Sequence, residues 1–596
     1  MKLTGGEIIV KQLLEEHVPY VLGIPGHGIL CFFDALRREC EAGKIAYIQV
    51  KHEQAATAIA DGYFRVTGRP LATFASIGPG TLNTAIGLGT AYVDGSAFLQ
   101  LCGDTHVHMK GVGVLQEVER YQDSNILRAL EPLSKRSWRV ENVKQLPRTI
   151  HRAFNQMLTG RCGPVAITLP MDVQASAVEC ELMKVQMSRT EARPEADPKS
   201  IHAALALMKK AKRPVILLGG GALKARVADK VETLARRWGA GVITTLQAKG
   251  AISEEFEQYC FHTGSKGTAI GVAIARTADV ILALGTRFAD ETCCSYRKGQ
   301  AFNFPDTKLI HVDIDPGEIG KNYGTDVGIV ADVSLALNQL LDQFNDFTVN
   351  GRYLEEIKKR REDWFRYLHD IRQIKSDKLT ISQVIGVMND ILPHDTRIVT
   401  SSGNTQAQLF QEYVYSAPYC NVTTGGFSTM GWALPSAIGV KLAFKDKPVV
   451  ALMGDGDFLM IMQELATLVQ YDIPVVVIVA DNSGWMAIKD LQMNAFGPDL
   501  AFGNDFLKDG QPYSPDFDKM AESFGLSHFR AETADQLKEA LQNALALNKP
   551  AFINVPVTRE FPLTGGQTFG WWDVPIPTYM DQKRREYEAA LVEETL

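Results

Sequence analysis

The side chains best suited to chemistry lie in two short polar turns, GDGD from Gly454 and DNSG from Asp481. Asp455 and Asn482 each offer a hard oxygen ligand, which suits Mg²⁺, an ion that completes its shell with phosphate oxygens and water. Gly454 and Gly456 allow a ligand to approach the backbone, and the free N–H groups of a following helix favour a phosphate. The two turns therefore predict a site for Mg²⁺ and a diphosphate. A GDG turn alone has a simpler interpretation, in which its aspartate only caps a helix, so the prediction depends on the asparagine that follows the second strand.

The apolar pattern predicts the elements that position these turns. Runs at 449–453 and 475–480 are typical of buried strands, and apolar residues at 458–468 recur at helical spacing. Strand, turn, helix and strand form a βαβ unit of a parallel sheet. Because ligands bind beyond the carboxyl ends of the strands in such sheets, both turns should lie at one edge and face the same ligand.

The same alternation of strand and helix patterns covers most of the chain, so we predict an α/β protein with three doubly wound parallel-sheet domains. Polar or charged segments at 184–199 and 344–376 are expected to link them. The tail carries two adjacent tryptophans among glycines and is expected to form a lid or a contact surface. The expected boundaries are 1–183, 197–345 and 377–558 for the domains and 559–596 for the tail.

Composition limits the possible functions. The 596 residues are 45% hydrophobic and 22% charged, which is usual for a globular protein. A net charge of −7 provides no basic surface, so a nucleic-acid partner is not expected. No apolar run approaches the length of a membrane span, and the first residues lack the apolar core of a signal peptide, so no membrane partner is expected. The nine cysteines lack metal-binding spacing and are typical of reduced thiols in the cytoplasm.

Two further turns are candidates for ligand binding. Glu53 is expected in the first turn of a helix that follows the strand 45–50, where a carboxylate commonly stabilises the helix dipole. The GGG turn at 219–221 follows the strand 215–218 and has the flexibility to cradle a dinucleotide phosphate. A glycine-rich turn alone is weak evidence, so neither turn by itself separates a binding role from a structural one.

Together these motifs resemble the thiamin diphosphate (ThDP)-dependent decarboxylase and carboligase family, and within it the acetohydroxyacid (acetolactate) synthase branch. A GDG turn followed by an asparagine is the ThDP signature, and the matches extend over nearly the whole chain. The matching segments are GIPG at 23–26, HEQ at 52–54, GPG with Asn83 at 78–83, Gln116 with Glu117, GTRFAD at 285–290, HVDIDPGEIGKN at 311–322 and GGFSTMGWALPSAIG at 425–439.

The resemblance implies a role for each matching residue. Glu53 would hydrogen-bond N1′ of the cofactor's aminopyrimidine and favour the imino tautomer, whose nitrogen removes the proton from thiazolium C2. Met430 would hold the cofactor bent, although a lone methionine is more often a plain core residue. His27 and Gln116 are further candidate catalytic residues of the first domain. Asp455, Asn482 and the carbonyl of Gly484 would hold the metal, and the other expected cofactor contacts are Gly403, Asn404, Thr405, Ser428, Gly454, Gly456, Asp457, Gly484, Trp485 and Met486.

The resemblance also names the domains, in chain order, as pyrimidine-binding, central nucleotide-binding-like and diphosphate-binding. In this family the site lies between the first domain of one subunit and the third domain of another, which implies a homodimer or a homotetramer. Gly219, Gly220, Arg287 and Asp313 match the flavin-binding positions of the synthase branch, so FAD in a non-redox role is expected in the middle domain. A nucleotide-type fold that is purely structural is the alternative.

The chain departs from the synthase pattern at several positions. Leu491 stands where synthases carry a tryptophan that shapes the acceptor pocket, and Asp104 replaces a usual glutamine. His27 and the tail motif FGWWDVP instead resemble ThDP-dependent hydrolases of cyclic diones, in which this histidine would shuttle a proton. A histidine packed into its turn is an equally good interpretation.

Two activities follow from this comparison. The first is a carboligase that decarboxylates a small 2-oxo acid such as pyruvate and joins the remaining carbons to a second carbonyl. The alternative is the hydrolytic opening of a cyclic 1,2-dione. The intact Glu53 and the Asp455 and Asn482 pair argue against a third possibility, a binding protein without catalysis.

Overall fold

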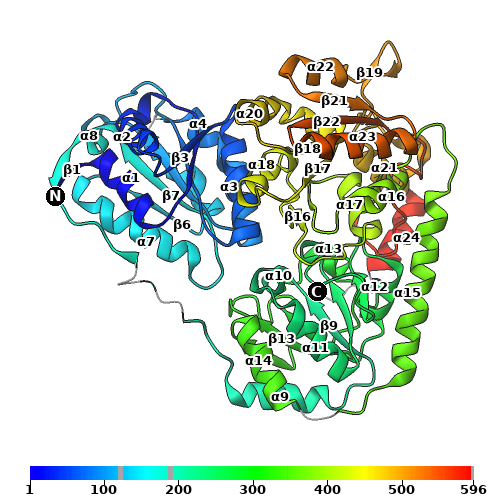
Figure 1. The fold of residues 1–596 in the computed structure, drawn as a ribbon. Coiled ribbons are helices and arrows are strands. Elements are labelled where there is room, and N and C mark those ends of the chain that lie inside the picture. Colours follow the sequence, from blue (N-terminus) through cyan, green and yellow to red (C-terminus); the bar gives the residue numbers. More distant parts are fainter. Residues whose placement is uncertain (119–124, 186–188, 190–191, 345–346, 592–596) are drawn as a thin grey trace.

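The structure, a computed structural model, has three lobes that follow one another along the chain (Figure 1). The first lobe is blue to cyan in Figure 1, the middle lobe is green and the third is yellow to orange. Each contains one six-stranded sheet in which every neighbouring pair of strands is parallel, so the predicted fold class is confirmed. The structure describes residues 1–118, 125–185, 189, 192–344 and 347–591, and part of the expected first linker lies outside them.

The first domain begins with a helix whose start is specified by local sequence. The Thr4 hydroxyl accepts a hydrogen bond from the N–H of Glu7, and the Glu7 carboxylate accepts one from the N–H of Thr4, which is a capping box. The elements are β1 (Lys2–Thr4), α1 (Gly5–Glu15), β2 (Tyr20–Gly23), η1 (His27–Ile29), α2 (Leu30–Glu41), β3 (Ala46–Gln49), α3 (Glu53–Thr67), β4 (Ala72–Ala75), α4 (Pro79–Asn83), α5 (Ala85–Asp94), β5 (Leu99–Asp104), α6 (Leu127–Leu130), β6 (Arg136–Arg139), α7 (Leu146–Leu158), β7 (Val165–Pro170), α8 (Met171–Ala175) and β8 (Ala177–Glu179).

The middle domain includes most of the segment 344–376 that the sequence indicated as a linker. There α15 buries Tyr353, Ile357, Trp364 and Leu368 in the middle-domain core, because these side chains share one helical face. The elements are α9 (Pro198–Met208), β9 (Pro214–Leu218), α10 (Gly220–Ala225), α11 (Ala228–Trp238), β10 (Gly241–Thr244), β11 (Tyr259–His262), α12 (Ala269–Arg276), β12 (Val280–Leu284), α13 (Asp290–Cys293), β13 (Lys308–Asp313), β14 (Val327–Val330), α14 (Val333–Gln343) and α15 (Gly351–Arg372).

The third domain contains both polar turns, GDGD after β17 and DNSG after β18. The single helix expected across 458–468 is wrong: α19 ends at Leu459, a 3₁₀ turn follows, and α20 begins at Leu465. The elements are α16 (Ile381–Ile391), β15 (Arg397–Thr400), α17 (Asn404–Glu412), β16 (Asn421–Thr423), α18 (Ala433–Ala443), β17 (Val449–Gly454), α19 (Asp455–Leu459), η7 (Met462–Glu464), α20 (Leu465–Gln470), β18 (Val476–Asp481), α21 (Met486–Phe496), β19 (Leu507–Lys508), β20 (Gln511–Pro512), α22 (Phe517–Phe524), β21 (Ser527–Arg530), α23 (Ala534–Leu547), β22 (Ala551–Pro556) and α24 (Asp581–Leu591).

Strand order defines where ligands bind. The first and third sheets share one topology, β3-β2-β4-β5-β7-β6 and β16-β15-β17-β18-β22-β21. The middle sheet, β11-β10-β9-β12-β13-β14, has the order typical of dinucleotide-binding folds. The order reverses between β2 and β4, between β9 and β12, and between β15 and β17, and ligands bind beside the carboxyl ends at such switch points. The GDGD turn follows β17 and the GGG turn follows β9, both at switch points, whereas the DNSG turn follows β18, the neighbour of β17.

The first and third domains pack closely through α3 and α18, which lie side by side between the two lobes (Figure 1). A Cβ atom at Gly439 would lie 2.0 Å from the carbonyl oxygen of Ile59, and one at Gly62 would lie 2.3 Å from Ser436 Oγ. Glycine is therefore required at both positions for the two backbones to approach this closely. The two domains share one buried apolar cluster, which makes them a single packed unit.

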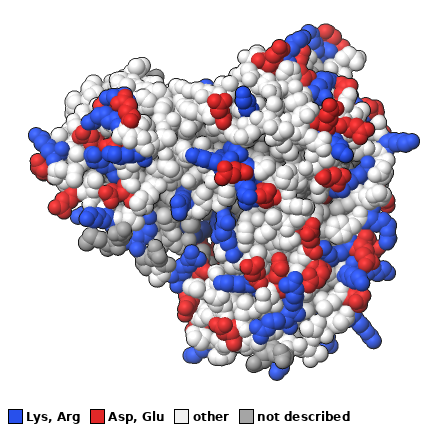
Figure 2. All heavy atoms as spheres, in the orientation of Figure 1, with Lys and Arg blue, Asp and Glu red and all other residues white. Residues whose placement is uncertain are grey.

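The surface and the tail add two further observations. Figure 2 shows Lys and Arg interspersed with Asp and Glu on the visible face, without a uniformly basic area. Within the described residues, no helix has the length and apolar character needed to cross a membrane. In the tail, the Trp571 ring lies 5.0 Å from the Arg297 guanidinium and Trp572 Nε1 donates to Asp290 at 2.9 Å, so both tryptophans contact the middle domain.

Candidate cofactor site

Three oxygen atoms converge where β17 and β18 end. The Asn482 carboxamide lies 3.2 Å from Asp455 Oδ1 and 3.1 Å from the carbonyl oxygen of Gly484. With the amide nitrogen toward these two acceptors, Asn482 donates to both; with the amide oxygen toward them, the three oxygens repel one another unless a cation lies between them. One carboxylate with two neutral oxygens suits Mg²⁺, which keeps its other positions for phosphate and water. The three predicted metal ligands therefore lie together.

Burial destabilises the ionised carboxylate of this cluster when no cation is bound. Asp455 is buried, and burial, with the charge of nearby Asp481, raises its pKa to about 7. The N–H of Gly484 donates to Asp455 Oδ2 at 3.0 Å, which only partly compensates the buried charge. A bound divalent cation would stabilise the ionised form, so the electrostatics agree with the geometry of the three oxygens.

The turns expected to bind the diphosphate leave space for a ligand next to their backbone. A Cβ atom at Gly403 or at Gly454 would meet no atom within 4 Å, so both turns face open space. Thr405, in the first turn of α17, has a buried hydroxyl with no hydrogen-bond partner in the described part of the chain. Because buried hydroxyls are normally paired, this donor fits an incoming phosphate oxygen. Asn404 is engaged elsewhere, since its amide donates to Asp490 at 2.9 Å and to the Thr564 carbonyl at 2.8 Å.

Several predicted cofactor contacts instead hold the turns in place. Both carboxylate oxygens of Asp457 accept at 2.5 Å, one from Ser401 Oγ and the other from the N–H of Gly431. Asp457 is buried, and burial raises its pKa to about 7. It therefore joins the turns after β15 and before α18 to the GDG turn.

Trp485 and Met486 pack against the glycines of the metal turns. A Cβ atom at Gly456 would lie 2.4 Å from the Trp485 ring, and one at Gly484 would lie 2.6 Å from Met486 Cε. Only glycine fits beneath these side chains, which fixes the path of both turns. The Trp485 ring also meets Phe506 edge to face, with ring centroids 5.3 Å apart.

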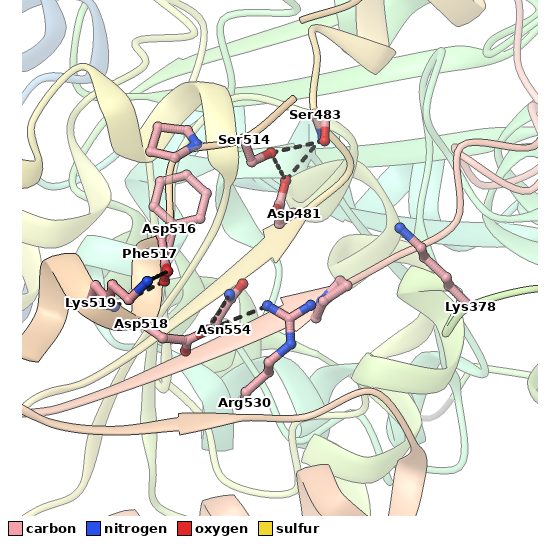
Figure 3. Close-up of a pocket in the computed structure, with 12 residues that line it drawn as sticks. Lys378, Asp481, Ser483, Ser514, Asp516, Phe517, Asp518, Lys519, Arg530 and Asn554 are labelled. Atoms are coloured by element: carbon pink, nitrogen blue, oxygen red, sulfur yellow. Dashed lines mark hydrogen bonds and ion pairs between the residues drawn. The ribbon is translucent and has the colours of Figure 1, made fainter. Parts of the chain in front are cut away.

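The other side of the Asn482 turn faces a cavity of about 540 Å³ at the carboxyl edge of the sheet (Figure 3). There Asp481 Oδ1 accepts from the N–H of Ser483 at 3.0 Å and from Ser514 Oγ at 2.6 Å, as the dashed lines mark. This network supports the turn that carries Asn482. The cavity is polar and open and lies beside the metal ligands, whereas the predicted diphosphate turns lie at β15 and β17.

In the first domain Glu53 begins α3, as predicted. Its Oε2 accepts a hydrogen bond from Asn83 Nδ2 at 3.0 Å, and a Cβ atom at Gly80 would lie 2.9 Å from its Oε1. The carboxylate is therefore oriented by the turn after β4, and glycine at position 80 leaves it room. A hydrogen bond to one oxygen leaves the other free for a ligand.

The other two catalytic candidates gather at the switch point of the same sheet. Ser76, after β4, accepts from the N–H of Gly28 at 3.2 Å and lies 3.4 Å from Gln116 Oε1. His27 is exposed at the start of η1, beside Gly28. A Cβ atom at Gly78 would lie 2.1 Å from the Gln116 carbonyl oxygen, so that turn must be glycine. The structure thus connects the His27 and Gln116 turns through Ser76, a residue that the sequence analysis did not single out.

A buried carboxylate from the third domain holds the start of α3. Glu464 Oε1 accepts from the N–H of Lys51 at 3.0 Å, and Oε2 accepts from Thr467 Oγ1 at 2.7 Å. Glu464 is fully buried, which raises its pKa to about 7. The break between α19 and α20 turns this side chain toward the first domain and fixes the backbone just before Glu53.

Replacing Glu464 with glutamine should stabilise the cofactor-free protein at alkaline pH. The folded-state pKa of about 7 exceeds the ordinary 4.5, so the carboxyl contributes stability below pH 4.5 that is lost as pH rises through 7. Glutamine keeps an acceptor for Lys51, and the Thr467 hydroxyl can rotate to accept. The gain over wild type should reach up to about 3 kcal/mol at pH 8 and shrink toward pH 5. Denaturant unfolding at both pH values measures it, and a gain independent of pH would contradict the assignment.

The segment between β16 and α18 carries Ser428 and Met430. The Ser428 and Ser402 hydroxyls lie 2.8 Å apart, and Ser428 has a left-handed backbone conformation with φ of 52°. Thr429 Oγ1 lies 2.6 Å from Thr90 Oγ1 of α5. Met430 is partly exposed rather than buried, which removes the plain core interpretation of this methionine.

In the middle domain the predicted nucleotide residues lie at the switch point of β9 and β12. A Cβ atom at Gly219 would lie 2.2 Å from the Gly285 carbonyl oxygen, and one at Gly220 would lie 2.6 Å from Gln247 Oε1. These contacts explain the glycines by packing between two protein turns, without a ligand. Asp313, at the end of β13, has its pKa raised to about 6 by burial and accepts from the N–H of Asp315 at 2.9 Å.

The three parallel sheets and the polar turns at their carboxyl edges are typical of an α/β protein that binds a ligand at sheet edges, and comparison with known proteins names the class. Residues 3–124, 201–340 and 401–555 match the N-terminal TPP binding, central and C-terminal TPP binding domains of thiamine pyrophosphate enzymes. The chain is 32% identical over 573 residues to a probable acetolactate synthase large subunit of Methanococcus aeolicus, covering 93% of this chain and 92% of that protein. It is 30% identical to the acetolactate synthase large subunit of Haemophilus influenzae, a match that covers 93% of this chain and 95% of that protein. It is also 32% identical to an acetolactate synthase of Arthrospira platensis, a match that covers 94% of this chain and 95% of that protein.

The chain therefore belongs to the thiamine pyrophosphate enzyme family and is a ThDP-dependent enzyme. The predicted resemblance is confirmed by a family match within each of the three domains and by relatives that cover 93% of the chain.

Proposed function

We propose that the chain is a ThDP- and Mg²⁺-dependent carboligase that acts on a small 2-oxo acid such as pyruvate, as an acetolactate synthase does. The convergence of the Asp455, Asn482 and Gly484 oxygens beside an open phosphate turn is the observation that carries this proposal. The relatives named as acetolactate synthases support the substrate class.

The first and third domains then have separate tasks. The oxygens of Asp455, Asn482 and Gly484 would hold Mg²⁺, and the Gly403 turn with the Thr405 hydroxyl would bind the diphosphate. Glu53, oriented by Asn83, would hold the proton at the aminopyrimidine N1′. When bound, the cofactor supplies a carbanion at thiazolium C2, a nucleophile that side chains lack. Met430 would contact the cofactor and hold it in the conformation needed for catalysis.

A second copy of the chain completes the site, giving a homodimer or a homotetramer. Glu53 is hydrogen-bonded to Asn83 of its own domain, and three large apolar side chains around that region are exposed: Leu82 (42%), Ile86 (45%) and Phe427 (41%). Exposed apolar residues grouped in this way are typical of a protein interface. The partner's third domain would then bring its Mg²⁺-diphosphate to this Glu53.

FAD is proposed as a second, non-redox cofactor of the middle domain. Support comes from the dinucleotide-type strand order and from Arg287 and Asp313 at the carboxyl ends of its strands. The packing of Gly219 and Gly220 against protein turns gives those glycines a structural reason of their own. The visible spectrum of purified protein, with and without added FAD, tests the proposal. Absence of bound flavin in both samples would contradict it.

Opening of a cyclic 1,2-dione is the second candidate. His27 is exposed at the switch point of the first sheet, where it can meet a ligand and shuttle a proton. Asp104, at the end of β5, forms an ion pair with Lys110 at 2.9 Å instead of presenting the neutral amide of synthases. These two departures lie at the edge that would meet the substrate.

Incubation with ThDP, Mg²⁺ and pyruvate, followed by NMR, separates the two candidates. We expect pyruvate to be consumed and acetolactate or acetoin to form, with release of CO₂. Unchanged pyruvate together with cleavage of cyclohexane-1,2-dione would reject the carboligase and favour the hydrolase. Bound ThDP is verified in the same sample, so that an empty enzyme is not mistaken for the wrong substrate.

A further inference from the structure

The segment that carries Met430 is held by a carboxylate of the first domain. Asp94, the last residue of α5, accepts from the N–H of Gly425 at 2.8 Å and from the N–H of Gly426 at 3.2 Å. One helical turn earlier, Thr90 bonds Thr429 at 2.6 Å. The same helix therefore holds both ends of the segment 425–429, which directly precedes Met430.

Asp94 is itself fixed by a buried ionic network. Its Oδ2 accepts from the Arg65 guanidinium at 2.8 Å, and both residues are nearly inaccessible to water. Arg65 also bonds Asp61 through two nitrogens and donates to the Thr423 carbonyl at the end of β16. A buried carboxylate paired in this way has little freedom to move, so it is a rigid anchor for the two glycine amides.

Two side chains of the middle domain also contact this part of the structure, Lys224 against the end of α5 and Arg287 beside Gly426. Lys224, in α10 directly after the GGG turn, donates to the carbonyls of Asp94 and Gly95. Burial lowers the pKa of Lys224 to about 8. Arg287, after β12, lies so close to Gly426 that a Cβ atom there would be 1.8 Å from its Nη2. A Cβ atom at Gly425 would likewise meet Asp94 Oδ1 at 2.4 Å, so glycine at 425 leaves room for this carboxylate, whereas a Cβ atom at 426 would displace only the end of the Arg287 side chain.

We propose that Asp94 is a positioning residue for the segment 425–430, and that Lys224 and Arg287 connect it to the middle domain. The middle domain thereby helps to set the place of Met430 against the cofactor. The functional consequence rests on the proposed role of Met430, whereas the mechanical link rests only on the contacts above. Asp94 acts through the segment and touches neither substrate nor cofactor.

The mechanical link is tested first in protein without cofactor. Asp94→Asn removes the charge and leaves one oxygen for two amides and Arg65. We expect amide hydrogen exchange in the peptide spanning 425–431 to become at least about tenfold faster. Glu254→Gln is the matched control, because the Lys249 and Glu254 pair is also fully buried and its residues do not contact this segment. Unchanged exchange in the Asp94 variant would overturn the proposal.

The functional consequence is read from the cofactor, without a substrate. The exchange of the ThDP C2 proton with deuterium, measured by NMR on the bound cofactor, should slow about tenfold or more in Asp94→Asn while ThDP affinity changes less than about threefold. Glu254→Gln should keep the wild-type rate. Normal C2 exchange in an Asp94 variant with a loosened segment would overturn the positioning role. If wild-type enzyme itself gave no accelerated C2 exchange, the proposed function would fail, and the amide measurement would still decide the link.

If Asp94→Asn does not fold, two milder variants still test the proposal. Thr90→Val removes the bond to Thr429, and Gly426→Ala forces Arg287 away from the segment. Each should slow C2 exchange in a folded protein, and their effects should be non-additive because they act on one segment. Folded variants that both retain wild-type C2 exchange would overturn the proposal.

Discussion

Asp455→Asn is expected to abolish Mg²⁺-dependent binding of ThDP while leaving the protein folded. The change removes the only carboxylate among the three converging oxygens, and Mg²⁺ depends on that charge. We expect the ThDP dissociation constant in Mg²⁺ to rise by on the order of 100-fold, which is about 2.7 kcal/mol. Asparagine is nearly isosteric and can still accept from the N–H of Gly484.

Folding and binding should respond in opposite directions in this variant. Burial raises the pKa of Asp455 to about 7, above the ordinary 3.8, so its stabilising contribution is lost as pH rises through 7. At pH 8 the uncharged asparagine should therefore unfold at the same or a higher temperature without cofactor. Calorimetric titration and thermal unfolding measure the two effects. Asp518→Asn, in the cavity of Figure 3, is the control and should bind ThDP normally. Wild-type affinity in Asp455→Asn would reject the metal site.

Glu53→Gln should lose turnover while still binding ThDP, in contrast to Asp455→Asn, which should lose ThDP binding. The amide cannot hold the N1′ proton as the carboxylate does, so we expect turnover to fall by about 10³-fold. The diphosphate anchor lies in the third domain and is untouched, so ThDP affinity should change little. Asn83→Ala, which removes only the 3.0 Å bond that orients Glu53, should cost roughly tenfold. Equal loss of ThDP binding in Glu53→Gln and Asp455→Asn would contradict this division of roles.

The order of strands and turns in the sequence was sufficient to predict which polar side chains lie at the carboxyl ends of the strands. Asp455 and Asn482 follow neighbouring strands β17 and β18, so parallel topology alone brings them together. The same reasoning placed Glu53 at the start of α3. Edge strands such as β6 and β21 were not predicted, because they are short, polar and partly exposed and lack the apolar run of a central strand.

The supporting residues could not be predicted, because their partners are distant in sequence. Asp94 bonds Gly425 across 331 positions, and Glu464 bonds Lys51 across 413. A buried carboxylate carries no periodic signal that names its partner. The broken helix at 458–468 has the same origin, since its apolar spacing fits one helix but Glu464 turns toward another domain.

The division of one site between two copies of the chain is the central claim, and mixed dimers test it most directly. A dimer with one Glu53→Gln chain and one Asp455→Asn chain, purified through two different tags, would contain one intact site and one doubly altered site. We predict about half the wild-type turnover of pyruvate per dimer, although each variant alone is nearly inactive. Mixed dimers as inactive as their parents would place Glu53 and Asp455 in the same site of one chain and contradict the account.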